Sequence, residues 1–279
     1  MLTAAALKAL LREQRLRLSR RLGQHHLIDA RAIERVAQAC RLSSQETVIE
    51  IGAGLGALTE LLAQRAGCVI AVEVDERFAR LLAGRLSDSA SVAVVCQDIL
   101  TISWERVRGA MVVGAIPYHI TSPILVSLSE AGAVIRRAIL ILQEEVAGRL
   151  LARPGTKAYG RLSVLAQYSW EIEPLFTVPR SAFFPQPTVD SRCIRLTPRL
   201  QAPVELADVA FFFRVVKAAF SQRRKTVVNC LAGSDWLEVP RARLEALVRG
   251  LGLSASIRGE ALSLEQLAGL ANALARRAG

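Results

Sequence analysis

The sequence has little that would place it in a membrane, a disulfide-bonded scaffold or a zinc protein. No apolar run reaches the roughly 18 residues of a membrane-spanning helix, although 52% of the 279 residues are hydrophobic. The five cysteines are odd in number and none lies in C-x-x-C spacing, which argues against a disulfide framework and a zinc site. We therefore expect a soluble chain in a reducing cytoplasm, without a bound metal.

Acidic residues are the minority among the charged ones. Lys and Arg number 36 against 25 Asp and Glu, so the formal net charge is +11. Such a surface favours binding of polyanions, with nucleic acid as the first candidate. The alternative is a generic basic surface that only aids solubility, which would have the same net charge. The N-terminal segment contains one acid, Glu13. A transit peptide would also be Arg-rich, but it would be richer in serine, and we interpret the segment as a functional basic arm.

Helical and strand patterns alternate from residue 30 to residue 150. Five buried strands are expected, at 47–51, 69–74, 91–96, 111–113 and 138–142. Helical patterns lie between them, and this order predicts an α/β fold with a parallel sheet and helices on both faces.

The last part of the chain has a different character. A longer strand pair is expected around 168–176 and 193–197. The proline-containing segment after it, LTPRLQAPVE, predicts a linker, and only helical patterns follow. We therefore expect an α/β domain at 1–200 and a small all-α domain at 201–279.

A glycine-rich loop, EIGAGLGA, ends the first strand and opens a helix. Glycines there permit a tight turn and close approach of the backbone to a ligand. Glu73 ends the next strand and Asp98 the third, where they can accept hydrogen bonds from a ribose and an adenine amine. Each acid alone is more typical of a solvated turn, but both in register with the loop favour a nucleoside cofactor. On this pattern S-adenosylmethionine and NAD are both open.

A second strand-end loop, within VVGAIPYHITSP, narrows the choice. The sequence Asn-Leu-Pro-Tyr, or a close variant, at a strand end marks amino-group methyltransferases that act on adenine, and this chain has AIPY from Ala115 to Tyr118. The chain resembles the small-subunit ribosomal RNA adenine N6,N6-dimethyltransferases. Six further segments resemble the family in the same order: RLGQHHLID, EIGAGLGALT, QEEVAGRLLARPGTKAYGRLSVLAQ, FFPQPTVDS, AFSQRRKTVVNCL and IRGEALSLEQL.

The resemblance implies a Rossmann-like class I methyltransferase sheet and S-adenosylmethionine as the cofactor. It implies a cofactor site made of Gln24, His25, Leu27, Gly52, Gly54, Glu73, Asp98 and Ala115. His25 stands at the family's asparagine position and His26 at a phenylalanine position. Both histidines are alternatively surface polar residues.

The resemblance also implies two successive methyl transfers to adenine N6. Tyr118 would stack on one face of the base and Phe183 on the other, and Pro117 would stiffen the loop; a core position beside Phe184 is the alternative for Phe183. Ala115 stands where the family has asparagine, and it has no side-chain acceptor for the amino group. The chain is therefore either an active dimethyltransferase, a weak or silent RNA-binding assembly factor, or a methyltransferase retuned to another acceptor.

Several basic runs are expected to contact RNA phosphates and to position the RNA without reading its sequence. These residues are Arg20, Arg21, Arg149, Arg153, Lys157, Arg161, Lys217, Arg223, Arg224 and Lys225. A single basic run is usually interpreted as a solvated charged face, but several runs in one chain favour RNA binding. We expect a monomer that binds small-subunit ribosomal RNA during ribosome biogenesis and does not bind membranes.

Overall fold

The computed structural model describes residues 4–19 and 22–275, and the chain divides into two compact units. The larger unit spans residues 1–147 and 170–198, and the smaller unit spans residues 148–169 and 199–279. The sequence-based division placed 148–169 in the first domain. This segment instead packs with the C-terminal helices, because Tyr159 and Val164 are buried in the same core as Phe212.

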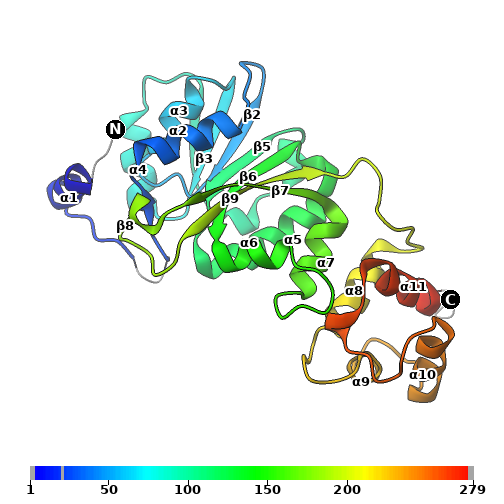
Figure 1. Cartoon of the computed structure of the whole chain (residues 1–279). Coiled ribbons are helices and arrows are strands. Elements are labelled where there is room, and N and C mark those ends of the chain that lie inside the picture. Colours follow the sequence, from blue (N-terminus) through cyan, green and yellow to red (C-terminus); the bar gives the residue numbers. More distant parts are fainter. Residues whose placement is uncertain (1–3, 20–21, 276–279) are drawn as a thin grey trace. The chain divides into compact units, whose positions relative to one another are not determined.

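A seven-stranded mixed sheet forms the centre of the larger unit (Figure 1). Its strands, in spatial order, are β4 (Val92–Cys96), β3 (Cys68–Glu73), β2 (Thr47–Ile51), β5 (Met111–Ala115), β6 (Arg137–Gln143), β9 (Ser191–Pro198) and β7 (Trp170–Val178). The first five strands pair in parallel. Strand β9 is antiparallel to both of its neighbours. The predicted parallel sheet is thus confirmed for five strands, and the later strand pair extends it with antiparallel pairing.

Helices cover both faces of this sheet, which explains why the central strands are apolar on both sides. In Figure 1, α2 (Ala30–Ala39), α3 (Ala57–Ala63) and α4 (Glu76–Arg85) lie on one side, and α5 (Thr121–Ala131) lies on the other. The helix α6 (Glu144–Leu150) follows β6 directly. Side chains cap two of the helices, because Asp29 accepts from the N–H of Ala32 at the start of α2 and Asp75 does the same for Arg77 at the start of α4.

A helix, a two-stranded ribbon and short 3-10 turns complete the larger unit. The N-terminal arm contains a helix, α1 (Ala4–Glu13), whose Leu7 and Leu11 are buried against Leu55 and Phe78. Strand β1 (His26–Leu27) pairs antiparallel with β8 (Phe183–Phe184). Short 3-10 turns are η1 (Ile99–Thr101), η2 (Trp104–Val107), η3 (Tyr118–Ile120), η4 (Gly132–Val134) and η5 (Arg180–Ala182).

The smaller unit is helical over the residues that the structure describes. Its elements are α7 (Arg161–Ser169), α8 (Val209–Ala219), α9 (Val227–Ala232), α10 (Arg241–Gly250), η6 (Gly259–Ala261) and α11 (Leu264–Ala275). The two long helices α8 and α11 bury one face each in a common core. Within residues 4–19 and 22–275, no helix is long and apolar enough to cross a membrane.

Candidate functional site

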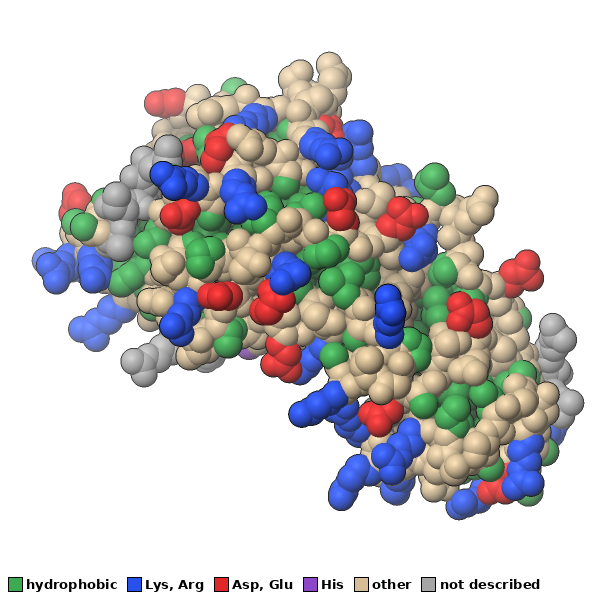
Figure 2. Space-filling view, in the orientation of Figure 1, with side chains coloured by type: hydrophobic (Ala, Val, Ile, Leu, Met, Phe, Trp, Pro, Cys, Tyr) green, Lys and Arg blue, Asp and Glu red, His purple; other side chains and the backbone are tan. Residues whose placement is uncertain are grey.

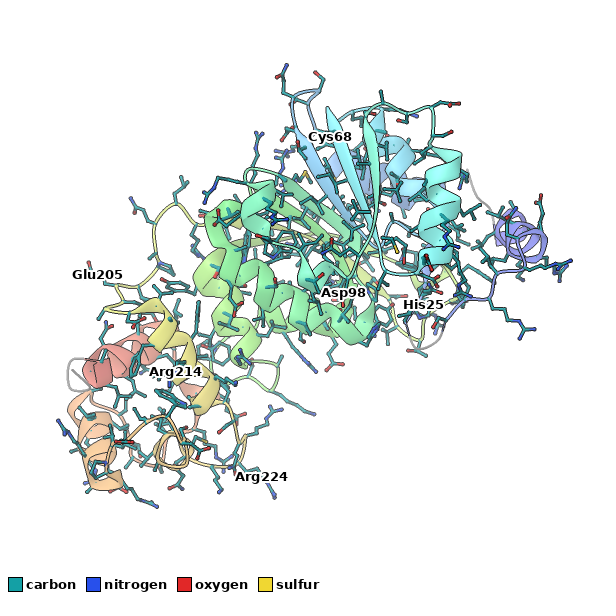
Figure 3. All side chains as sticks on the ribbon, turned by 180° about the vertical axis from the view of Figure 1, so that it is seen from behind. His25, Cys68, Asp98, Glu205, Arg214 and Arg224 are labelled. Carbon is teal, nitrogen blue, oxygen red and sulfur yellow. The ribbon has the colours of Figure 1, made fainter. Side chains whose placement is uncertain are left out.

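The main pocket of the larger unit lies where β2, β3, β4 and β5 end, at the carboxyl edge of the sheet. It holds about 980 Å³ of empty space, open solvent included. Figure 3 shows Cys68, at the start of β3, at the opposite end of the sheet from Asp98 and His25. Ligands of open α/β sheets bind at this edge. Two sequence-predicted groups therefore come together in one pocket: the glycine loop with its acids, and the AIPY loop.

The glycine loop, Gly52 to Gly56, makes the sharp turn from β2 into α3. Three of its residues have positive φ angles: 70° at Gly52, 54° at Gly54 and 82° at Gly56. L-residues with a Cβ disfavour this conformation. The loop is also crowded, because a Cβ on Gly54 would come within 2.7 Å of Nδ1 of His26. The glycines are thus required by the backbone geometry, independently of any ligand.

Glu73 ends β3 and is buried beside the glycine loop. Its Oε2 accepts from the backbone N–H of Gly54 and its Oε1 from that of Asp75, both at 2.9 Å. Burial raises the pKa of this carboxyl, and the backbone N–H groups oppose the rise. A carboxylate has about four acceptor sites, so Glu73 keeps acceptor capacity for the hydroxyls of a ribose.

Asp98 is the more exposed acid of the pair. It caps η1, and its Oδ1 accepts from the N–H of Leu100 at 3.0 Å. Both it and Gln97 line the main pocket. The structure therefore brings Asp98 to the same pocket as Glu73, from the neighbouring strand.

Asp75 is a residue of this site that the sequence analysis missed. Arg77 forms an ion pair with it at 2.6 Å, and Gln24 donates to the same oxygen at 3.1 Å. The hydrogen bond from Arg77, followed by that from Gln24, lowers the pKa of Asp75. The amide of Gln24 is thus tied to the start of α4, while the residue lines the main pocket. The signal in the sequence was the second acid of AVEVD.

Glu50 was also missed, and it is the most deeply buried acid of the site. It lies one residue before the end of β2 and accepts from Thr59 Oγ1 at 2.5 Å. Burial raises its pKa to about 8. Glu50 lines a smaller pocket behind the glycine loop, together with Leu7, Leu27 and Leu55. The predicted cofactor residue Leu27 thus lies in the wall of this smaller pocket.

The two histidines occupy different environments, and neither is a freely solvated surface residue. His26 packs its ring against Phe78, with the centroids 5.2 Å apart. Burial lowers its pKa to about 4, and the nearby His25 contributes; its buried Nε2 has no hydrogen-bond partner among the described residues. His25 is half-buried, and its ring stacks on Tyr118.

The AIPY loop leaves the sheet at the end of β5 and leads into η3. Ala115 lines both the main and the smaller pocket. The carbonyl of Pro117 accepts from the N–H of Ile120 and from Thr121 Oγ1, each at 3.1 Å. The hydroxyl of Tyr118 lies 3.5 Å from Ser191 Oγ, a long contact that contributes little. Burial raises the pKa of Tyr118.

Phe183 differs from the exposed loop residue that the sequence analysis favoured. It pairs with Leu27 in the β1–β8 ribbon, and only 5% of its surface is exposed. It belongs to the core cluster beneath α2, yet it also lines the main pocket. Phe183 therefore forms part of the pocket wall and of the core at once.

The basic residues expected to bind RNA gather on the smaller unit, as far as the structure describes them. The described members are Arg149, Arg153, Lys157, Arg161, Lys217, Arg223, Arg224 and Lys225, all within 148–169 and 199–279. Arg20 and Arg21 lie outside the described residues. Figure 2 shows Lys and Arg side chains on the surface of this unit as well as on that of the larger unit, and Figure 3 shows Arg224 at the edge of the smaller unit.

Two of these runs are far apart in sequence but adjacent in the smaller unit. Arg223 donates to the carbonyl of Lys157 at 2.6 Å and forms an ion pair with Glu260 at 3.0 Å. Arg223 is therefore partly engaged in holding the loops together, whereas Lys217, Arg224 and Lys225 are exposed. Arg161 is half-buried, and its Nε is buried without a partner among the described residues.

Metal binding has no support in the described part of the chain, where no three His, Cys, Asp or Glu side chains come close enough to hold an ion. The groups of the main pocket instead suit a nucleoside: Glu73, an acid that can accept hydrogen bonds, and a glycine-rich loop whose backbone a ligand can approach closely.

Comparisons with known proteins agree with this geometry. Residues 15–273 match the family model of ribosomal RNA adenine dimethylase. Ribosomal RNA small subunit methyltransferase A of Geobacillus sp. (strain WCH70) is 42% identical over 262 residues, which cover 91% of this chain and 90% of the relative. The protein of the same name from Bacillus mycoides (strain KBAB4) has the same identity and coverage.

Solved structures show the same fold. The 23S rRNA methyltransferase ErmE is 32% identical, with a TM-score of 0.65, covering 89% of this chain and 99% of that one. A dimethyladenosine transferase from Plasmodium falciparum has a TM-score of 0.72 at 24% identity, covering 88% and 95%. The predicted class I methyltransferase fold is thereby confirmed, and the chain belongs to the ribosomal RNA adenine dimethylase family.

Proposed function

We propose that this protein uses S-adenosylmethionine to dimethylate adenine N6 in small-subunit ribosomal RNA during ribosome biogenesis. One observation carries the proposal: a single pocket joins the glycine loop and Glu73 to the AIPY loop and Tyr118. A methyl donor and a flipped-out base can therefore meet there. The relatives named for small-subunit methylation support the choice of RNA.

The cofactor half of the pocket fits S-adenosylmethionine. Glu73 keeps acceptor capacity for ribose hydroxyls, and the glycine loop lets the backbone approach the ligand closely. Asp98, which lines the same pocket, would accept from the adenine amine of the cofactor. Gln24, Leu27, Gly52 and Gly54 form the remaining walls. When bound, S-adenosylmethionine supplies a methyl group activated by a positively charged sulfur.

The other half of the pocket is suited to hold the target adenine. The base must leave its stack to be reached, and stacking on Tyr118 offsets roughly 1–3 kcal/mol of that cost. Pro117 restricts the loop that carries the ring, and Phe183 closes the wall behind it. The N6 lone pair is delocalised into the base, so acceptors for the amino hydrogens are needed to make it available.

Ala115 supports a second candidate function. The resemblance places asparagine at this position, and the loss of one polar group directed at a transition state costs about 10²–10³ in rate. A chain that bound the cofactor and the subunit without turnover would be an RNA-binding assembly factor. Retuning to another acceptor is the third candidate, and the 32% identity to a 23S rRNA methyltransferase makes large-subunit RNA the acceptor to test.

RNA binding is assigned to the basic residues of the smaller unit, with Arg224, Lys225 and Lys217 as its exposed members. Arg20 and Arg21 in the arm belong to the same proposal. We further propose that the protein acts as a monomer in the cytoplasm, away from membranes.

The test is transfer of labelled methyl groups to small subunits that lack the modification. Large subunits and an unrelated RNA serve as controls. We expect dimethyladenosine in small-subunit RNA only. Incorporation no higher than without enzyme, at stoichiometric protein, would contradict the proposed activity; cofactor and subunit binding in the same samples would then favour the assembly factor.

A further inference from the structure

His25 bridges the two walls of the proposed base pocket. Its ring stacks on Tyr118 with centroids 5.5 Å apart and planes inclined by 28°. Its Nδ1 lies 2.6 Å from the carbonyl oxygen of Pro185. The resemblance had placed this residue in the cofactor site, but both contacts are with the AIPY and FFPQP segments.

The contact with Pro185 determines which ring nitrogen carries the hydrogen. A carbonyl oxygen only accepts, so Nδ1 must be the donor at 2.6 Å. In the neutral ring Nε2 is then an acceptor. Among the residues that the structure describes, none hydrogen-bonds to Nε2, and His25 is half-buried and lines the main pocket.

The stacking geometry puts the imidazole of His25 beside the position that a base stacked on Tyr118 would occupy. Stacked rings in full contact are about 3.5–4.0 Å apart, so a centroid distance of 5.5 Å means that His25 is displaced sideways and covers part of the tyrosine ring. An adenine stacked parallel to the remainder would lie beside the imidazole, with its plane inclined by about 28° to that of the imidazole. A hydrogen bond from an aromatic amino group to a ring nitrogen forms close to the planes of both rings, and a tilt of this size keeps it within the usual angular range.

The pocket also needs such an acceptor. Ala115 offers no side-chain oxygen, and the carbonyl of Pro117 already accepts two hydrogen bonds. We propose that Nε2 of His25 accepts a hydrogen bond from the N6 amino group of the target adenine, and that His25 thereby supplies the acceptor that residue 115 lacks. This inference rests on the proposed function.

His25 can also take the proton that each methyl transfer releases from N6. The N6 electron pair forms the new C–N bond, and the electron pair of the broken C–S bond stays on sulfur. N6 must lose one proton for each methyl group gained. That proton passes to Nε2 and from the half-buried ring to water, which leaves the acceptor ready for the second transfer.

The test is a double-variant cycle with His25→Phe, Ala115→Asn and the two combined. Phenylalanine keeps an aromatic ring on Tyr118 and removes both nitrogens, and His25→Gln returns an acceptor near the position of Nε2. Single-turnover methyl transfer to unmethylated small subunits gives the rate, and calorimetry with S-adenosylhomocysteine gives cofactor affinity. Thermal unfolding checks that each variant folds.

We expect His25→Phe to lower the rate about 10²–10³-fold, with cofactor affinity within about threefold of the parent and part of the rate restored in His25→Gln. In the Ala115→Asn background the same change should cost less than about tenfold, because neighbouring groups with a shared role are not additive. The proposal would be overturned if His25→Phe lowered the rate equally in both backgrounds, or left it unchanged or faster in the parent. It would also be overturned if the loss of rate were matched by an equal loss of cofactor affinity. If the parent protein is inactive and Ala115→Asn is active, the role of His25 is excluded but the proposed methyl transfer is not. If both proteins are inactive on small subunits, the proposed function itself is contradicted.

Discussion

The backbone N–H of Gly54 donates to Oε2 of Glu73 at 2.9 Å, so the acid that ends β3 holds the glycine loop that follows β2. The other oxygen of Glu73 accepts from Asp75 at the start of α4. One carboxylate thus fixes two backbone segments on the wall where a nucleoside would lie. Substitution of Glu73 separates its role in the fold from its proposed role in cofactor binding, because stability and affinity are measured independently.

Glu73→Gln should weaken binding of S-adenosylhomocysteine. In the variant, the amide NH₂ replaces one acceptor oxygen and faces a backbone N–H, so a hydrogen bond to the carboxylate is lost. A hydrogen bond to a charged group contributes about 1.5–3 kcal/mol, which corresponds to roughly 10–100-fold in Kd. Calorimetry measures the Kd. Glu76→Gln is the matched control, because Glu76 is exposed and pairs with Arg80. Equal affinities in parent and Glu73→Gln would remove Glu73 from the cofactor site.

Glu50 should make the protein less stable as the pH rises from about 5 to 8. Burial raises its pKa from 4.5 to about 8, so across this window the folded state keeps a proton that the unfolded state has lost. The free energy of unfolding therefore falls with increasing pH, and the loss is complete above the folded pKa. In Glu50→Gln, which can still accept from Thr59, the fall in Tm between these pH values should be smaller. The same pH dependence in both proteins would exclude Glu50 as its source.

Gly54→Ala should destabilise the protein for two separable reasons. The φ angle of 54° costs an L-residue about 1–2 kcal/mol, and the new Cβ would lie 2.7 Å from the His26 ring. Adding His26→Ala should restore the stability lost to the steric clash, and the cost of the positive φ angle should remain. Gly148→Ala is the control, because a Cβ there meets nothing within 4 Å. A Tm loss in Gly54→Ala no larger than in that control would contradict the account.

Tyr118→Ala should weaken productive binding of the target base by about 1–3 kcal/mol, the value of one stacking contact. Tyr118→Phe should behave like the parent, because the hydroxyl makes only the 3.5 Å contact with Ser191. Single-turnover rates at varied subunit concentration measure both. If the phenylalanine variant loses as much as the alanine variant, the hydroxyl and not the ring face is the important group.

Arg224→Ala combined with Lys225→Ala should reduce the salt dependence of RNA binding. Each phosphate contact contributes about 0.7–0.9 to the log–log slope, so loss of two should reduce it by about 1.4–1.8. Arg108→Ala in the larger unit is the control, since Arg108 is exposed and pairs with Glu105. Filter binding to small-subunit RNA at several salt concentrations measures the slope. An unchanged slope in the double variant would place the RNA elsewhere.

Most elements of the fold follow from local pattern. The five parallel strands lie within about two residues of their expected positions, because continuous apolar segments flanked by glycines and helical periodicity are local features. The placement of 148–169 did not follow, since Tyr159 and Val164 show only that they are apolar and not which core they enter. Strand β1 was missed as well, because two residues are too few for a periodic signal.

The candidate site divides in the same way. Glu73, Asp98 and the AIPY loop were predictable because strand ends of a parallel sheet meet at one edge. The roles of Asp75, Glu50 and His25 were not, since each depends on groups distant in sequence: Gln24, Thr59 and Pro185 respectively. Phe183 belonged to both the core and the pocket, a combination that sequence does not reveal.

The sequence by itself determined the order of the elements, the glycine loop, the identity of the acids at the strand ends and the absence of a side-chain acceptor at Ala115, because these are properties of single residues and short segments. The tertiary structure alone decided that His25 faces Tyr118 and Pro185 and that the basic runs at 157 and 223 meet. Hydrogen bonds and stacking form between atoms a few ångströms apart, and only the folded chain brings residues separated by many positions within that distance.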